Sequence, residues 1–238
     1  LELPEALEDL ITADLYVSLC AHSGRPEVLT SWLDPSIIDE IDPTSIDPDL
    51  NMYDKRNGPP YSSEFIQKYR TAQESRNHRI TDWCHSELHR LDELNMTDRA
   101  FNLFRTWADL RLMDGSIDAS KREVGRCYAG DPKQANFGPR GIGLTNTLRT
   151  WLSMWSLKDS HCRGAPHLNR INLPALIIQS SGDTGVFPSD AESIYNALGS
   201  EDKTLKMIDG DHYLIEPIGA RKKAADLIAN WLADNNAN

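Results

Sequence analysis

The sequence of 238 residues is long enough for one large domain, or for a domain that carries a sizeable insertion. Its 39% hydrophobic and 26% charged residues are typical of a globular protein, and its formal net charge of −11 argues against binding to nucleic acid, whose phosphates attract Lys and Arg. No apolar run approaches the roughly 20 residues of a membrane helix, and no basic and then apolar signal segment opens the chain. We therefore expect no membrane contact and a cytoplasmic location.

The first predicted element is a buried strand over residues 15–21, where most residues are apolar or favour β-structure. The polar residues 22–26 end this strand, and residues 28–33 are predicted to form one helical turn. Residues 1–33 are expected to form the end of the first half of an α/β core.

Residues 34–168 are predicted to form a large helical insertion. Three Asp-Pro pairs between residues 34 and 48 indicate turns rather than a sheet. A loop over residues 125–143 is rich in glycine and is predicted to be flexible. The spacing of apolar residues predicts helices at residues 62–94, 97–110 and 148–157.

The final section, residues 169–238, returns to an alternation of strands and helices. The sequence predicts strands at 173–179 and 203–208, and helices at 189–198 and 220–232. Short apolar strands that alternate with helices are typical of a parallel sheet with helices on both faces, so this section is predicted to complete an α/β core.

Each of these two strands is followed by a turn that carries a residue suited to acid–base chemistry. Asp183 lies in Gly-Asp-Thr-Gly after the first strand, and His212 follows Asp-Gly-Asp after the second. Neighbouring parallel strands end at the same edge of a sheet, which is where ligands bind in open α/β sheets. A carboxylate that orients a histidine, which in turn accepts a proton from a hydroxyl, is the arrangement of a nucleophilic triad. We predict that Asp183 and His212 are the acid and the base of such a triad.

On these residues, the last 70 positions resemble the end of an α/β-hydrolase-fold enzyme. The acid loop is similar to that family's Gly-x-x-Asp-x-x-Val-x-Pro turn, although here Gly182 directly precedes Asp183, and the order Asp before His agrees with the family. The resemblance implies an α/β-hydrolase fold, which is a doubly wound, mostly parallel sheet, with residues 34–168 as a large helical lid. It further implies hydrolysis of a small-molecule carboxylic ester, or of an amide or thioester, without a metal or organic cofactor.

The nucleophile of that family has no counterpart in this sequence. No Gly-x-Ser-x-Gly motif occurs, and Ser23 and Ser181 lie near glycines without the strand–elbow–helix context that exposes a nucleophile. The family's first strands and its oxyanion-hole loop would precede residues 15–21. We therefore expect an obligate partner, either an N-terminal segment of a processed parent or a separate chain in a heterodimer, that carries the nucleophile and the oxyanion hole. The first residue, Leu1, is consistent with a longer parent.

Two other functions remain open at this stage. Related α/β-hydrolase folds use an Asp nucleophile on haloalkanes or epoxides, and this alternative stays open because the nucleophile lies outside the sequence. A hydrolase-like binding protein could also retain Asp183 and His212 without any turnover.

Several other residues have a weaker claim to a functional role. Trp151 and Trp155 form an aromatic stripe on a predicted helix; such stripes usually belong to a core, but here they are predicted to wall an acyl pocket. His85 and His89 share a helix face, yet they lack a third ligand, so a solvated face is favoured over a metal site. The four cysteines are widely spaced, without a Cys-x-x-Cys pair, and are predicted to be reduced thiols.

Overall fold

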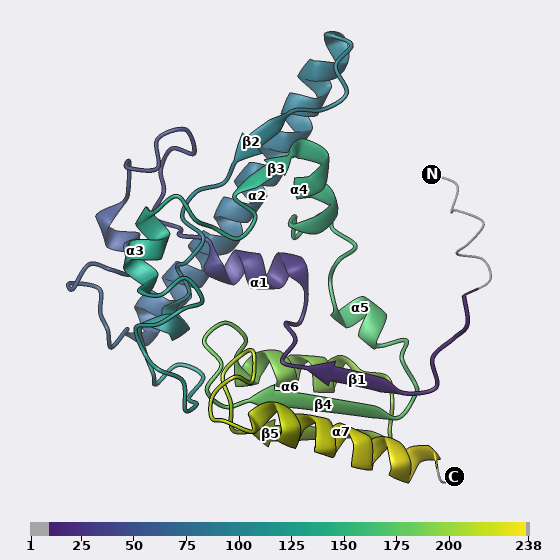
Figure 1. The fold of residues 1–238 in the computed structure, drawn as a ribbon. Helices are drawn as coiled ribbons and strands as arrows, with labels where there is room; N and C mark the ends of the chain where they lie inside the picture. The colour runs from purple at the N-terminus through teal and green to yellow at the C-terminus, as the bar shows by residue number, and fades with distance from the viewer. Residues whose placement is uncertain (1–9, 237–238) are drawn as a thin grey trace.

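The computed structural model describes residues 10–236, and in it the chain forms a small α/β core with a long insertion between the first two strands of that core (Figure 1). The core strands are β1 (Tyr16–Leu19), β4 (Ala175–Ser180) and β5 (Lys203–Ile208). They form a parallel sheet in the order β1-β4-β5. The predicted α/β class with a parallel sheet is therefore confirmed.

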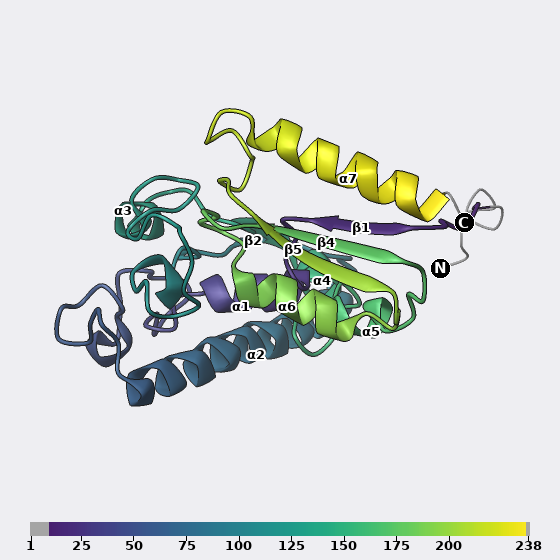
Figure 2. The same ribbon diagram turned by 90° about the horizontal axis from the view of Figure 1, so that it is seen from below.

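Strand β4 is the centre of this core because both of its faces are covered. All six of its residues are buried, as expected for an apolar run in a parallel sheet. Side chains alternate between the faces, so Leu176 and Ile178 pack with helix α7 (Ala220–Asn236), and Ala175 and Ile177 pack with helix α6 (Pro188–Ala197). Figure 2 shows α7 on one side of the sheet and α6 on the other. The two strands and two helices predicted for this section are each found, with small shifts of their ends.

The insertion contains most of the helical structure of the chain. Its helices are α1 (Arg25–Trp32), α2 (Ser63–Glu93), α3 (Pro132–Phe137), α4 (Leu148–Met154) and α5 (Ala165–Leu168), with 3₁₀ turns at Pro48–Leu50 and Leu110–Leu112. A short antiparallel pair joins β2 (Ala100–Asn102) to β3 (Thr145–Thr147). Helix α2 begins where the sequence predicts, because the Ser62 hydroxyl accepts a hydrogen bond from the Phe65 N–H. None of the helices in the described part of the chain combines the length and the apolar character needed to cross a membrane.

The helix predicted at residues 97–110 is wrong. The segment instead forms β2 and an extended stretch, in which Phe101 packs edge-on against Trp83 and Trp151. Arg105 then adopts a positive φ of 60°, which a right-handed helix does not allow. Pairing with β3 and aromatic packing have overridden the helical spacing of the apolar residues. Two smaller corrections concern the turn predicted at 28–33, which belongs to the eight-residue α1, and the loop at 125–143, which contains α3.

Helix α2 orders this irregular insertion through buried polar side chains. The Gln73 amide donates to the carbonyl oxygens of Ser31 and Leu33, at 2.7 and 2.8 Å, and the Asn77 amide donates to the carbonyl oxygen of Trp155 at 2.8 Å. Buried backbone groups outside helices and sheets need such partners, because an unpaired one is costly. Helix α2 therefore holds in place, by side-chain hydrogen bonds, connecting segments that have little regular structure of their own.

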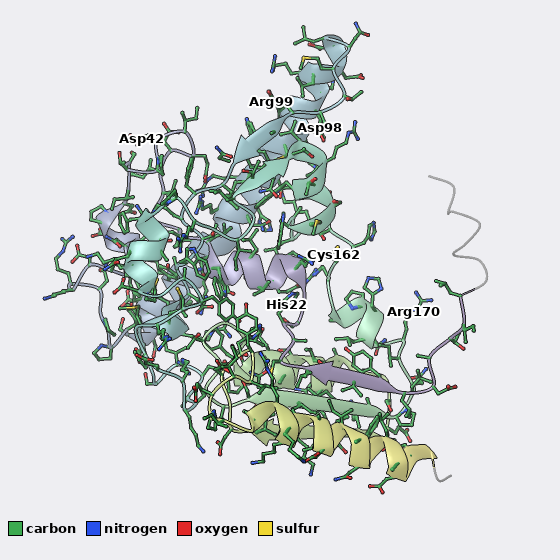
Figure 3. All side chains as sticks on the ribbon, in the orientation of Figure 1. His22, Asp42, Asp98, Arg99, Cys162 and Arg170 are labelled. Atoms are coloured by element: carbon green, nitrogen blue, oxygen red, sulfur yellow. The ribbon has the colours of Figure 1, made fainter. Side chains whose placement is uncertain are left out.

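The chain enters and leaves the insertion at one narrow crossing. Gly24 and Arg163 form a β-bridge, and the Arg25 N–H donates to the Cys162 carbonyl at 3.1 Å. A Cβ atom on Gly164 would lie 1.9 Å from the Ser23 carbonyl oxygen, so only glycine fits at this crossing. In Figure 3, His22 and Cys162 mark the two segments on either side of it.

A second junction joins the insertion to the start of α6. The Arg111 guanidinium, which is largely buried, lies 2.7 Å from Asp109 and 3.4 Å from each of Asp118 and Asp190. It also stacks over the Phe187 ring at 4.0 Å. Burial alone would raise the pKa of the Asp109 carboxyl, but the nearby Arg111 and Arg70 charges outweigh it and lower that pKa. The ion pair between Asp109 and Arg111 therefore remains charged at neutral pH.

Replacing this guanidinium should destabilise the protein. Arg111→Met removes a cation from the buried Asp109 and Asp190 carboxylates and from the partly buried Asp118, and we expect the free energy of unfolding to fall by about 3 kcal/mol. Chemical denaturation followed by circular dichroism measures the change.

The chain offers a matched control for this substitution. Asp54 and Arg56 form the same Asp-x-Arg ion pair, at 2.6 Å, on the surface. Arg56→Met should leave the unfolding midpoint unchanged, because exposed ion pairs contribute little. Equal effects of the two substitutions would contradict the structural role of Arg111.

Candidate active site

Asp183 is held rigidly in the turn that follows β4. Its carboxylate is buried, and Oδ1 accepts the N–H groups of Gly185 and Val186, each at 2.9 Å. The other oxygen, Oδ2, lies 2.8 Å from Nδ1 of His212. A carboxylate can only accept at this contact, so Nδ1 carries the proton and Nε2 is left as an acceptor.

The two predicted residues meet because the loops that carry them are tied together. The Gly182 N–H donates to the Gly210 carbonyl at 2.8 Å, and the Ser180 hydroxyl donates to the Asp211 carbonyl at 3.0 Å. A Cβ atom on Gly182 would lie 2.8 Å from the Gly210 oxygen, so the loops approach this closely only with glycine. The structure thus brings Asp183 and His212 together at the carboxyl edge of the sheet, although 29 residues separate them.

His212 lies in the wall of a cavity of about 660 Å³ at this edge. Its side chain is 23% exposed, and Nε2 makes no hydrogen bond to residues 10–236. The aromatic rings of Tyr128 and Tyr213 also line the cavity. Its charged lining residues are Lys121, Glu123, Arg126, Asp209, Asp211 and Glu216. A group bound in this cavity can give a proton to Nε2 while Asp183 stabilises the resulting imidazolium.

Tyr128 is part of this site, although no pattern in the sequence indicates it. It comes from the insertion, and its ring centroid lies 4.8 Å from that of His212. Its position depends on a tight turn between Cys127 and Gly130, which bond to one another at 2.8 and 2.9 Å. A lone tyrosine in a glycine-rich loop has no pattern that distinguishes it from a surface residue.

None of the nucleophilic side chains near the site is bonded to His212. Ser23 donates to Asp190 at 3.5 Å, and Ser181 donates to Asp209 at 3.2 Å. Cys20 lies at the end of β1 with a φ of 44°, but burial raises the pKa of its thiol. Within residues 10–236, then, no hydroxyl or thiol occupies the position of a nucleophile toward Nε2.

The predicted substrate-binding tryptophans lie elsewhere. Trp151 is fully buried in a core between α2 and α4, and its indole N–H donates to the Thr81 hydroxyl at 3.0 Å. Trp155 belongs to the same core and lies beneath the Arg25 guanidinium. Neither lines the cavity at His212. Both residues therefore have a packing role, as is usual for an aromatic stripe on a helix.

The paired histidines of α2 each lie near a different acid. His85 lies 3.1 Å from Asp159, and His89 lies 3.7 Å from Glu93. In the part of the chain that the structure describes, no three His, Cys, Asp or Glu residues are arranged so that they could hold a metal ion.

Comparison with known proteins does not assign the chain to a family. No protein-family model matches the chain, and no curated protein matches it. Among solved structures, it is similar to the crystal structure of a monoacylglycerol lipase from Paleococcus ferrophilus, with 18% identity and a TM-score of 0.32. The match covers 57% of this chain and 46% of the lipase chain, so it spans less than half of the latter.

The four thiols should differ in reactivity because they differ in burial, and this difference tests whether Cys20 is a nucleophile. Cys162 is exposed, whereas Cys20, Cys84 and Cys127 are buried, and burial raises the pKa of each, for Cys84 to about 12. We expect iodoacetamide at neutral pH to modify Cys162 at least roughly tenfold faster than the others, as measured by peptide mass mapping. Rapid labelling of Cys20 would instead make its thiol a candidate nucleophile.

Proposed function

We propose that Asp183 and His212 are the acid and base of a Ser-His-Asp triad in an α/β-hydrolase-fold enzyme that hydrolyses small-molecule carboxylic esters. The observation that carries the proposal is the 2.8 Å contact between Asp183 Oδ2 and His212 Nδ1, with Nε2 unbonded in the cavity wall. A buried carboxylate on Nδ1 fixes the tautomer in which Nε2 is the base. The cavity volume of about 660 Å³ is in the range of small-molecule sites.

The reaction proceeds in two acyl-transfer steps, and the His212 imidazole moves the protons in both. A serine hydroxyl attacks the ester carbonyl carbon while His212 Nε2 accepts its proton, and Asp183 stabilises the imidazolium through Nδ1–H. The imidazolium then protonates the departing alkoxide, which leaves an acyl-enzyme. Water attacks the acyl-enzyme with His212 again as base, and the serine recovers its proton.

The serine and the oxyanion hole belong, in this proposal, to a partner segment that adds a strand beside β1. The Tyr16 and Cys20 N–H groups point to β4, so those of Val17 and Leu19 point to the outer edge of β1, where no strand of residues 10–236 pairs. An exposed strand edge is a template for another strand. A parallel strand added there would end at the edge that carries Asp183 and His212. The insertion would then be the lid over that edge.

A covalent probe tests this division of roles. The protein, isolated with any polypeptide that accompanies it, is treated with a fluorophosphonate probe and analysed by intact mass spectrometry under native and denaturing conditions. We expect the label on a serine of an accompanying segment, because the probe needs a nucleophile activated by His212. Turnover without label favours an Asp nucleophile, and ligand binding without turnover favours a binding protein.

Substitution of the two residues should remove turnover without removing the fold. We expect His212→Ala to lower the rate of ester hydrolysis by roughly 10⁶-fold, because the proton transfer is lost, and Asp183→Asn to lower it by roughly 10⁴-fold, because the tautomer is lost. His85→Ala is the control: His85 is an exposed histidine of α2 that contacts Asp159, and its loss should leave the rate unchanged. Hydrolysis that survives His212→Ala would refute the proposal.

A further inference from the structure

The imidazole of His212 packs against two tyrosine rings, which also lie near each other, with centroids 6.0 Å apart. The Tyr128 ring centroid lies 4.8 Å from it with an interplanar angle of 45°, and that of Tyr213 lies 4.8 Å away at 80°. Tyr213 follows His212 directly in the chain and moves with it. Tyr128 comes from the insertion, so it restrains the imidazole from a separate part of the fold.

The same tyrosine also reaches the carboxylate that orients the histidine. Its hydroxyl lies 3.4 Å from Asp183 Oδ1, the oxygen that does not contact His212. Burial, with the nearby Asp183 charge, raises the pKa of the Tyr128 phenol. The phenol therefore stays protonated and donates to the carboxylate. One side chain thus touches both members of the pair.

Other residues of the insertion fix the position of the Tyr128 ring. Its ring packs against Trp32 and Trp107, with centroids 5.9 and 6.5 Å away. The Cys127–Gly130 turn that carries it closes with Gly130 at a φ of +100°, a conformation that favours glycine. The position of Tyr128 is therefore set by the insertion, and that of His212 by the core.

Gly185 in the acid loop leaves room for this contact. A Cβ atom on Gly185 would lie 1.8 Å from the Tyr128 hydroxyl oxygen and 1.9 Å from the carbon that bears it. Gly185 has no positive φ, so its backbone does not require glycine. The close approach of the tyrosine does require it.

We propose that Tyr128 is a positioning residue that keeps the His212 imidazole bonded through Nδ1 to Asp183, by packing on the ring and donating to the carboxylate. The inference rests on the proposed function of the pair. It gives the insertion a direct role in the acid–base chemistry, through Tyr128, in addition to its role in packing.

The closing experiment reads the His212 tautomer directly. Long-range ¹H–¹⁵N spectra distinguish a neutral imidazole with its proton on Nδ1 from one with its proton on Nε2, and they need no substrate. We expect the Nδ1–H form alone in the unaltered protein. Tyr128→Ala should allow the ring to turn, so that the Nε2–H form rises from below detection to a comparable fraction. Tyr128→Phe keeps the packing ring and should restore most of the Nδ1–H form.

Gly185→Ala tests the same contact from the other side. It should displace the Tyr128 ring and reproduce the tautomer mixture of Tyr128→Ala. In a protein that already carries Tyr128→Ala it should have no further effect on the tautomer, because the two residues act through one contact. Tyr195→Ala is the matched control: Tyr195 is a partly buried tyrosine of α6 that packs in a different cluster, so its loss should leave the tautomer unchanged.

Hydrolysis of 4-nitrophenyl acetate by the complete enzyme supplies the second readout. Tyr128→Ala should lower kcat at least roughly tenfold with KM little changed, because positioning acts on the transition state. If Tyr128→Ala and Gly185→Ala both keep the pure Nδ1–H form, the inference is overturned even if the enzyme hydrolyses esters. If the tautomer changes as expected while the unaltered protein shows no hydrolysis, the proposed function fails and the positioning role stands.

Discussion

The buried guanidinium of Arg111 is the interaction on which the relation between the insertion and the core depends. It collects carboxylates from the insertion and from the start of α6, and it covers the Phe187 ring at the exit of the acid loop. One planar cation can neutralise these three acids only if the insertion and the start of α6 both stay in place. The acid loop therefore has its conformation fixed at both ends, by β4 before Asp183 and by this ion cluster after it.

The contact between Asp183 and His212 follows from that rigidity. Loop residues are usually the mobile part of a fold, but here the carboxylate has backbone donors, and one hydrogen bond between Gly182 and Gly210 ties the neighbouring loops. The insertion then adds Tyr128 against the same pair. Preorganised groups of this kind stabilise charge that develops during a reaction without reorganising at that moment.

The sequence predicted the parts of this arrangement that follow from local pattern. Strands β4 and β5 and helices α6 and α7 have clear periodicities, and the turns after the strands place Asp183 and His212 at one edge. The helix predicted at 97–110 failed because its apolar spacing suited an extended segment paired with β3 equally well. The roles of Tyr128 and of the two tryptophans depended on which segments of the insertion meet the core. That information lies in long-range packing rather than in spacing along the chain.

The crossing at Gly24 and Gly164 bears on how the chain folds. Its hydrogen bonds hold together two segments that the whole insertion separates in sequence. Once the insertion has folded and closed this crossing, the core needs only a short loop to bring β1 beside β4, so most of the entropy of closing that loop has already been lost. Through this crossing, β1 and β4 are near neighbours in the folded chain, although the whole insertion separates them in sequence.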